Sequence, residues 1–93
     1  MLSARRDANI TCVSRNIRGL RVHLASLLNQ GNDIYLLQET DVAEAHVQLL
    51  KAQAKAAGYY IEFGQAVTLD KGGTIGRRVA ILSRFQLYAI PEV

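Results

Sequence analysis

Two polar residues, Asn16 and Glu39, have the chemistry of a divalent-cation site, and each follows a short segment typical of a strand. An amide oxygen and a carboxylate are hard donors that Mg²⁺ accepts. Mg²⁺ commonly takes only one or two protein carboxylates beside water and substrate phosphates. The residue types leave an alternative open, in which Asn16 shapes a turn and Glu39 favours the positive end of a following helix.

The elements that would position this pair alternate between strands and helices. Leucines at positions 20, 24, 27 and 28 have helical spacing, and Gly31 follows them as a stop signal. Asp41, with Glu44 three positions on, is expected to cap a second helix that closes at Gly58. The predicted order is a strand at 9–14, a helix from 20, a strand at 33–37, a helix at 41–58, and strands at 59–63, 79–82 and 86–90.

This order has a consequence for the polar pair. A strand, a helix and a parallel strand connect by a right-handed crossover, which places the carboxyl ends of both strands at one edge of the sheet. Asn16 and Glu39 each lie two residues past such an end, so both are expected to face the same crevice. The unbroken apolar run Ile34–Leu37 also predicts a strand that is covered on both faces.

Composition limits the class of protein. The chain has 93 residues, of which 49% are hydrophobic, and this suits one small globular domain. No apolar run has the length of a membrane span, and Met1–Arg6 lacks the pattern of a secretory signal, so we expect an intracellular protein of the nucleus or cytoplasm. The single cysteine, Cys12, excludes an internal disulfide and is expected to be a buried thiol. His23 and His46 lie apart on predicted helices, which excludes a metal cluster of Cys and His.

The formal charge of +3 comes from arginines that gather near the two ends of the chain. A folded sheet can bring both groups onto one face, which would attract a polyanion such as nucleic acid. The alternative is that these arginines are scattered solubilising charges. The candidate nucleic-acid contacts are Arg15, Arg18, Arg77 and Arg78.

Four segments occur in the order and spacing of a known superfamily: SRNIRGL at 14–20, DIYLLQET at 33–40, GYYIEFG at 58–64 and RVAILSR at 78–84. Together they resemble the endonuclease/exonuclease/phosphatase superfamily, and their wording is most similar to retroelement endonucleases and to repair nucleases of the exonuclease III type. The resemblance implies an α+β fold, namely the N-terminal half of a deoxyribonuclease I-like four-layer sandwich with the order β-α-β-α-β-β(-β). It covers residues 9–93 as a partial domain and leaves 1–8 as a tail.

The resemblance also implies roles for the polar pair. Glu39 matches the metal-binding glutamate of the family, and Asn16 matches the asparagine that organises the metal and phosphate site, with Mg²⁺ or Mn²⁺ as the cofactor. The sequence departs from the family pattern at two places. Arg15 replaces a usual aromatic residue, and Arg77 and Arg78 replace glycines before the VAILSR segment.

The function that the resemblance implies is metal-dependent phosphodiester cleavage of nucleic acid, with DNA as the expected substrate. The remaining catalytic residues of the family, an Asp and Asn pair and a C-terminal Asp and His couple, would lie beyond Val93. We therefore expect the chain to be inactive alone, with the missing C-terminal half of the domain or a second copy of itself as its partner. The alternatives are a noncatalytic nucleic-acid-binding remnant and a small nucleotide-binding or structural module.

Overall fold

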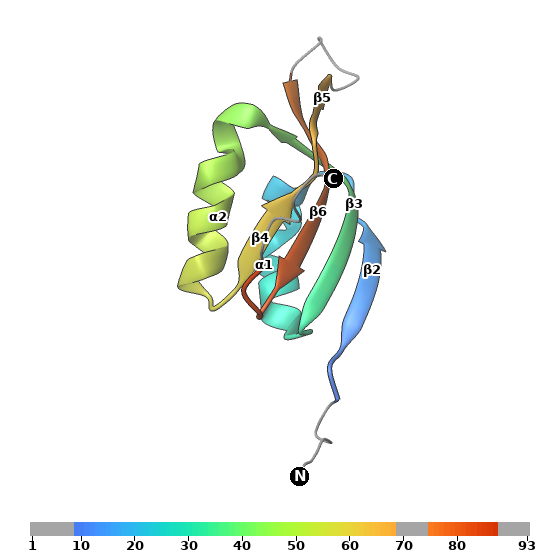
Figure 1. Ribbon diagram of the computed structural model, residues 1–93, viewed down its shortest axis with the longest axis vertical. Coiled ribbons are helices and arrows are strands. Elements are labelled where there is room, and N and C mark those ends of the chain that lie inside the picture. Colours follow the sequence, from blue (N-terminus) through green and yellow to red (C-terminus); the bar gives the residue numbers. More distant parts are fainter. Residues whose placement is uncertain (1–8, 69–74, 88–93) are drawn as a thin grey trace, which may run out of the picture.

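The computed structural model describes residues 9–68 and 75–87, which form one mixed sheet and two α-helices (Figure 1). The predicted α+β fold class is confirmed. The predicted tail at 1–8 lies outside the described residues, as do positions 88–90 of the predicted last strand, whereas Gln86 and Leu87 are described and are not in a strand. The strands are β2 (Cys12–Asn16), β3 (Ile34–Ala43), β4 (Tyr60–Phe63), β5 (Ala66–Thr68) and β6 (Ile75–Ser83), and the helices are α1 (Leu20–Gln30), the short 3-10 helix η1 (Glu44–His46) and α2 (Val47–Ala56).

The sheet has the order β2-β3-β6-β4, and β5 pairs with the first part of β6. β2 runs parallel to β3, whereas β6 runs antiparallel to β3, β4 and β5. In the parallel pair, Asn16 is in register with Gln38, one residue before Glu39. The carboxyl end of β2 therefore lies beside the middle of β3, as the predicted crossover through α1 requires.

Helix α1 forms because its leucines share one face and its end is well defined. Leu20, Leu24 and Leu27 are buried, and Gly31 adopts the left-handed conformation with φ of 79°, which glycine reaches without steric cost. The hydroxyl of the buried Tyr35 donates a hydrogen bond to the carbonyl of Leu27. This bond joins the C-terminal part of α1 to the first part of β3.

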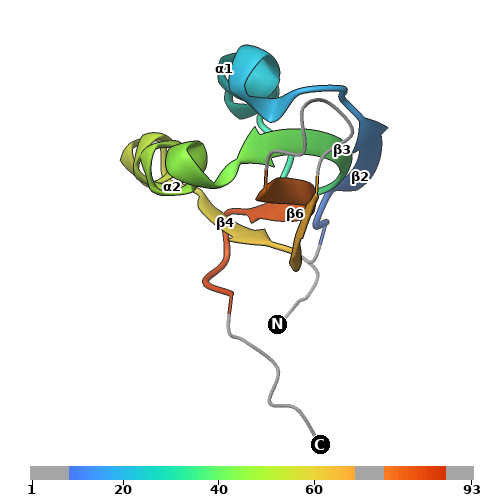
Figure 2. The same cartoon turned by 90° about the horizontal axis from the view of Figure 1, so that it is seen from above.

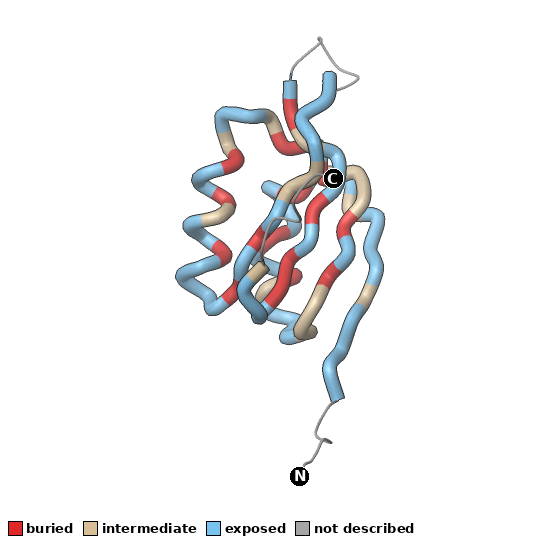
Figure 3. Tube along the Cα trace, viewed as in Figure 1, coloured by how far each residue is buried: buried red, intermediate tan, exposed pale blue. Residues whose placement is uncertain are grey.

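Both helices cover the same face of the sheet, and the opposite face is open among the described residues (Figures 2 and 3). Tyr35, Leu37, Ala80 and Leu82 are buried in the core beneath the helices. Their neighbours along the strands point the other way, and Leu36, Val79 and Ile81 are 39%, 49% and 39% exposed. The expectation that β3 is covered on both faces was wrong for these residues. The apolar run Ile34–Leu37 is unbroken because the side chains of β3 on the open face, such as Leu36, are apolar as well.

Strand β3 is longer than predicted, and this displaces the second helix. β3 continues to Ala43 because Val42 and Ala43 pair with Arg77 and Gly76 of β6. The predicted helix start at Asp41 was therefore wrong, since η1 begins at Glu44 and α2 only at Val47. Neither helix has a side-chain cap hydrogen bond.

The two residue types that metals favour most have different surroundings from those expected. Cys12 is exposed on the edge strand β2, so the prediction of a buried thiol was wrong. His23 is exposed on α1, whereas His46 is partly buried where η1 meets α2, and its Nδ1 atom has no hydrogen-bond partner among the described residues. No helix in the described ranges is long and apolar enough to cross a membrane.

Candidate functional site

The site begins with the contact between Asn16 and Glu39. The side-chain amide of Asn16, at the end of β2, donates a hydrogen bond of 2.6 Å to Oε2 of Glu39 on β3. The Glu39 side chain is 42% exposed, so solvent and ligands reach its carboxylate. The prediction that these two residues share one edge of the sheet is confirmed.

A bulge in β3 presents Glu39. The register between β3 and β6 shifts between Gln38 and Val42, so that three residues of β3 face Arg78 alone. Within the bulge, Thr40 is buried and its hydroxyl donates a 2.8 Å hydrogen bond to the carbonyl of Arg77. Glu39 and Asp41 on either side of Thr40 have positive φ angles of 53° and 48°. The anchored Thr40 thus leaves the two flanking carboxylates at the surface.

The loop between β2 and α1 is tied to the same bulge. The Ile17 amide donates to the Gln38 carbonyl at 3.1 Å, and the Gly19 amide donates to the Glu39 carbonyl at 2.9 Å. Arg18 between them has a φ of 47°, a left-handed conformation that is uncommon outside glycine. Residues held in such conformations cluster at binding and catalytic sites, and three of them meet here.

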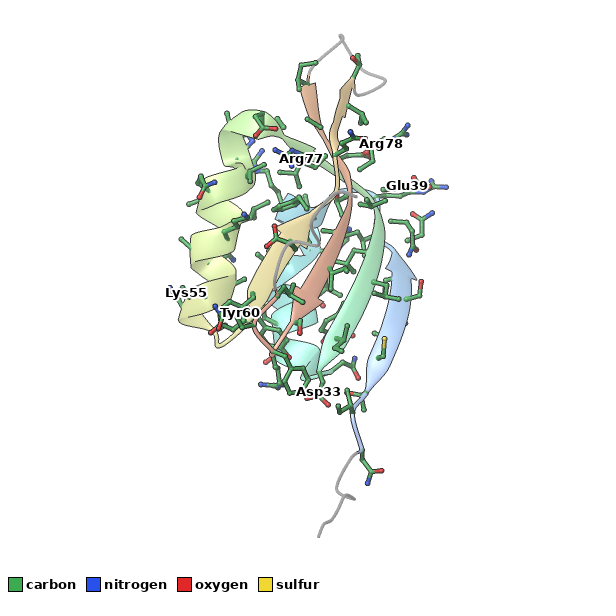
Figure 4. The ribbon with its side chains drawn as sticks, viewed as in Figure 1. Asp33, Glu39, Lys55, Tyr60, Arg77 and Arg78 are labelled. Carbon is green, nitrogen blue, oxygen red and sulfur yellow. The ribbon has the colours of Figure 1, made fainter. Side chains whose placement is uncertain are left out.

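Two arginines flank the carboxylates of the bulge. Nε of Arg18 lies 3.8 Å from Oε1 of Glu39, and Nε of Arg78 lies 4.0 Å from Oδ1 of Asp41. Figure 4 shows Glu39 and Arg78 at the same end of the sheet. Asp41 was predicted to cap a helix, and its position beside Glu39 was missed. The signal available in the sequence was that Asp tolerates the left-handed conformation better than most residues.

Arg77 has a different environment from its neighbour Arg78. Its Nε and Nη2 each donate 2.9 Å hydrogen bonds to the carboxylate of Glu44, and Nη1 donates to the carbonyl of Gly64 at 2.9 Å. The Arg77 hydrogen bonds hold the pKa of Glu44 below its usual value. Two parallel bonds of this kind are geometrically specific, so Arg77 joins β6 to η1 and to the turn before β5. This placement favours a structural role, and nucleic-acid contact by Arg77 stays a prediction.

Arg15 and Arg18 border an open hollow of about 410 Å³ beside Asn16, at the edge of β2. The opposite wall belongs to α1 and carries His23, Ser26 and Gln30, none of which was a predicted site residue. Arg15 donates a 3.1 Å hydrogen bond to the Ser14 carbonyl. The hollow combines cationic and neutral hydrogen-bonding groups, which is the chemistry of phosphate recognition.

The donor set at Glu39 fits a hard cation that keeps much of its water. It offers the Glu39 carboxylate and the amide of Asn16, with the Asp41 carboxylate on the same bulge. Within residues 9–68 and 75–87, no group of three or more His, Cys, Asp or Glu side chains is arranged to hold a metal ion. A cation at Glu39 would therefore take few protein ligands, as Mg²⁺ and Mn²⁺ do beside substrate phosphates.

Asp33, just before the start of β3, also lies beside an arginine, but its contacts differ from those of Glu39. Nε of Arg84 lies 3.3 Å from Oδ1 of Asp33, and the Arg84 guanidinium stacks 4.7 Å from the centre of the Tyr59 ring. Figure 4 shows Asp33 at the end of the sheet away from Glu39. Arg84 therefore lies at the other end of the sheet from Arg18 and Arg78, away from the candidate site.

Comparison with known proteins agrees with this architecture. The model of the Endonuclease/Exonuclease/phosphatase family matches residues 7–93. The chain belongs to this family, whose members are hydrolases of the nuclease and phosphodiesterase type. The sheet with helices on one face corresponds to the N-terminal half of the deoxyribonuclease I-like fold. Neither the curated proteins nor the solved structures contain a significant match to the chain.

Proposed function

We propose that this chain supplies the metal-binding half of a Mg²⁺- or Mn²⁺-dependent phosphodiesterase that acts on nucleic acid, with DNA as the expected substrate and a retroelement-type or repair-type endonuclease as the whole protein. The contact between Asn16 and Glu39 on the bulge carries this proposal. It joins the two residues that the family resemblance assigns to the metal and phosphate site.

The residues of this site would have separate roles in binding the cation and the nucleic acid. Glu39 would hold the cation, and Asn16 would orient the Glu39 carboxylate through its 2.6 Å hydrogen bond. A bound divalent cation neutralises charge that develops on the phosphate and on the leaving oxygen. Arg15 and Arg18 would attract the phosphates of the nucleic acid into the neighbouring hollow.

We propose that the 93 residues do not cleave nucleic acid by themselves. Hydrolysis needs a group that activates water as well as a group that stabilises charge. The family resemblance assigns the activating role to an Asp and His couple that has no match among these residues. His23 lines the hollow, but none of the described residues that line it with His23 carries a carboxylate.

A chimeric protein tests whether this chain supplies the metal site while the C-terminal half supplies the group that activates water. When the chain is fused to the C-terminal half of a well-behaved family member, Mg²⁺-dependent nicking of supercoiled DNA should appear, and Glu39→Ala should abolish it. The control is Gln53→Ala, because Gln53 is an exposed polar residue of α2, on the helix side of the sheet and away from both the bulge and the open face. Full nicking by the isolated chain, or a chimera whose nicking ignores Glu39, would contradict the proposal.

We propose that the open face of the sheet is a binding surface and that its partner is the second half of the family domain. Leu36, Phe63, Val79 and Ile81 border an apolar hollow of about 310 Å³ on this face. In a four-layer sandwich such a face packs against a second sheet. The isolated chain should therefore bind a hydrophobic dye, and Ile81→Lys should reduce that binding more than Val22→Lys on the far side of α1. A second copy of the chain is the alternative occupant, which sedimentation would show as a dimer that Ile81→Lys dissociates.

The noncatalytic alternative rests on the arginines of the hollow. If the protein only binds nucleic acid, affinity for an oligonucleotide should fall steeply with salt and should be lost on Arg15→Gln, with no cleavage even in the chimera. Restored cleavage in the chimera would exclude this alternative.

A further inference from the structure

The cation that faces Glu39 in the structure is a side chain of the protein itself. The two oxygens of the Glu39 carboxylate have different neighbours. Oε2 accepts the hydrogen bond from Asn16, and Oε1 faces Nε of Arg18 at 3.8 Å. A positive charge already stands beside the group that the proposed function assigns to a divalent cation.

The backbone keeps Arg18 at this position. Its two neighbours, Ile17 and Gly19, donate hydrogen bonds to the carbonyls of Gln38 and Glu39. The left-handed conformation of Arg18 lies between these two anchors. The loop therefore holds the backbone of Arg18 beside the bulge, which keeps its side chain within reach of Glu39.

The side-chain contact, in contrast, is easily broken. The distance of 3.8 Å exceeds the length of a direct hydrogen bond, and the Arg18 side chain is 82% exposed. An exposed ion pair of this kind contributes little free energy, so a divalent cation can displace it at small cost. Arg18 also borders the hollow beside Asn16, where a released guanidinium would remain within the same site.

We propose that Arg18 and a divalent cation compete for the Glu39 carboxylate, and that cation binding releases Arg18 to a phosphate of the nucleic acid. This inference rests on the proposed role of Glu39. It makes Arg18 a positioning residue that couples the two ligands, because each ligand removes the cost of breaking the ion pair for the other. Coupling of this kind is reciprocal by linkage.

The first test measures Mn²⁺ binding to the isolated chain by the loss of the free Mn²⁺ signal in electron paramagnetic resonance. Arg18→Gln should tighten the dissociation constant about two- to fivefold, since the competing ion pair is gone. Arg18→Lys keeps the charge and should return the constant towards that of the unchanged chain. The matched control is Arg21→Gln, which removes an equal charge from the exposed first turn of α1.

Three results separate the possible outcomes. Equal effects of Arg18→Gln and Arg21→Gln would mean that Arg18 acts only through the net charge of the protein. This result would contradict the proposed competition for Glu39. Weaker Mn²⁺ binding by Arg18→Gln would overturn it as well. If Glu39→Gln leaves Mn²⁺ binding unchanged, the proposed function itself fails, whatever Arg18 does.

A second test measures the coupling. At constant ionic strength, Mn²⁺ should tighten the binding of a fluorescent single-stranded DNA oligonucleotide at least twofold more in the unchanged chain than in Arg18→Gln. Fluorescence anisotropy gives both constants without any need for cleavage. The same Mn²⁺ effect in both proteins would show that the released Arg18 does not contact phosphate.

Discussion

The Asp33 end of β3 and the bulge at Glu39 in the middle of this strand each have an acidic residue beside an arginine, but their hydrogen bonding differs. Asp33, which directly precedes β3, accepts hydrogen bonds from the amide and the hydroxyl of Thr11 at 2.9 and 3.1 Å, and its own amide donates to that hydroxyl at 2.8 Å. At the bulge, the described partners of the Glu39 side chain are one hydrogen bond, from Asn16, and one arginine at 3.8 Å, Arg18. The Asp33 end is satisfied by its own chain, whereas the bulge keeps acceptor capacity for a ligand.

The arginines at these two places show the same difference. Arg84 has the Asp33 carboxylate, the Gly31 carbonyl and the Tyr59 ring as neighbours, so its guanidinium has several structural contacts. Arg18 is mostly exposed, and its ion pair within the described part of the chain is the 3.8 Å approach of Nε to Oε1 of Glu39. An acidic residue beside an arginine is therefore not by itself a sign of function. The number of satisfied hydrogen bonds and the backbone conformation distinguish the candidate site from the structural network.

The largest expected effect on stability comes from removing the buried side chain of Tyr59, which lies beside Arg84 near Asp33. Tyr59 is 1% exposed, its hydroxyl donates a 2.6 Å hydrogen bond to the Asn32 carbonyl, and its ring lies 6.3 Å from that of Tyr35. Tyr59→Ala should lower the free energy of unfolding by about 3–5 kcal/mol, the usual cost of removing a buried aromatic side chain. Urea denaturation measures it. The neighbouring Tyr60, 39% exposed, provides the control, and Tyr60→Ala should cost clearly less (Figure 4).

Neutralising one carboxylate at each place is the most direct comparison. Asp33→Asn removes the negative charge that strengthens two Thr11 hydrogen bonds and pairs with Arg84, so it should lower the urea midpoint. Glu39→Gln has fewer bonds to lose and should leave the midpoint nearly unchanged, while it weakens Mn²⁺ binding. If Glu39→Gln destabilised the chain as much as Asp33→Asn does, the bulge would be a structural network as well.

Acid should weaken the structural pairs. The backbone hydrogen bond from Thr11, with smaller help from the Thr11 hydroxyl and Arg84, holds the pKa of Asp33 below its usual 3.8, and Arg77 holds that of Glu44 below 4.5. Groups whose pKa is lowered on folding stabilise the protein above their ordinary pKa, and this stability is lost as the pH falls through the folded values. Stability should therefore decline from about pH 4.5 downwards.

The double variant Asp33→Asn with Glu44→Gln checks the source of this acid dependence. Its stability should fall less steeply between neutral pH and pH 3 than that of the unchanged chain. Glu62→Gln on the open face is the control and should preserve the slope. An unchanged slope in the double variant would assign the acid dependence to other groups.

The smallest effect concerns the backbone of the bulge. Asp41 has a φ of 48°, so Asp41→Gly relieves conformational strain while it adds flexibility to the unfolded chain. The two effects oppose each other, and the free energy of unfolding should change by less than about 0.5 kcal/mol. Glu62→Gly in β4 has only the unfavourable effect and should cost about 0.5–1 kcal/mol. A larger loss for Asp41→Gly would mean that its side chain stabilises the bulge.

The sequence by itself determined the elements that local patterns specify. Helical leucine spacing with a glycine stop predicted α1, and alternating Tyr59, Ile61 and Phe63 predicted β4 with its buried and exposed sides. The crossover rule brought Asn16 to Glu39 across 23 positions of the sequence. These features depend on periodicity and chain direction, which one sequence contains.

Only the tertiary structure decided the bulge, the open face and the roles of the arginines. β3 continues past Gln38 because β6 pairs with it again at Val42, and that pairing depends on Arg77, 35 positions further along the chain. The same pairing turned Asp41 from a predicted helix cap into a neighbour of Glu39. Arg77 and Arg78 are adjacent in sequence, but successive side chains of a strand point to opposite faces, so one meets Glu44 and the other meets the bulge. Which partner each one finds depends on the elements packed on those faces, and no local pattern records it.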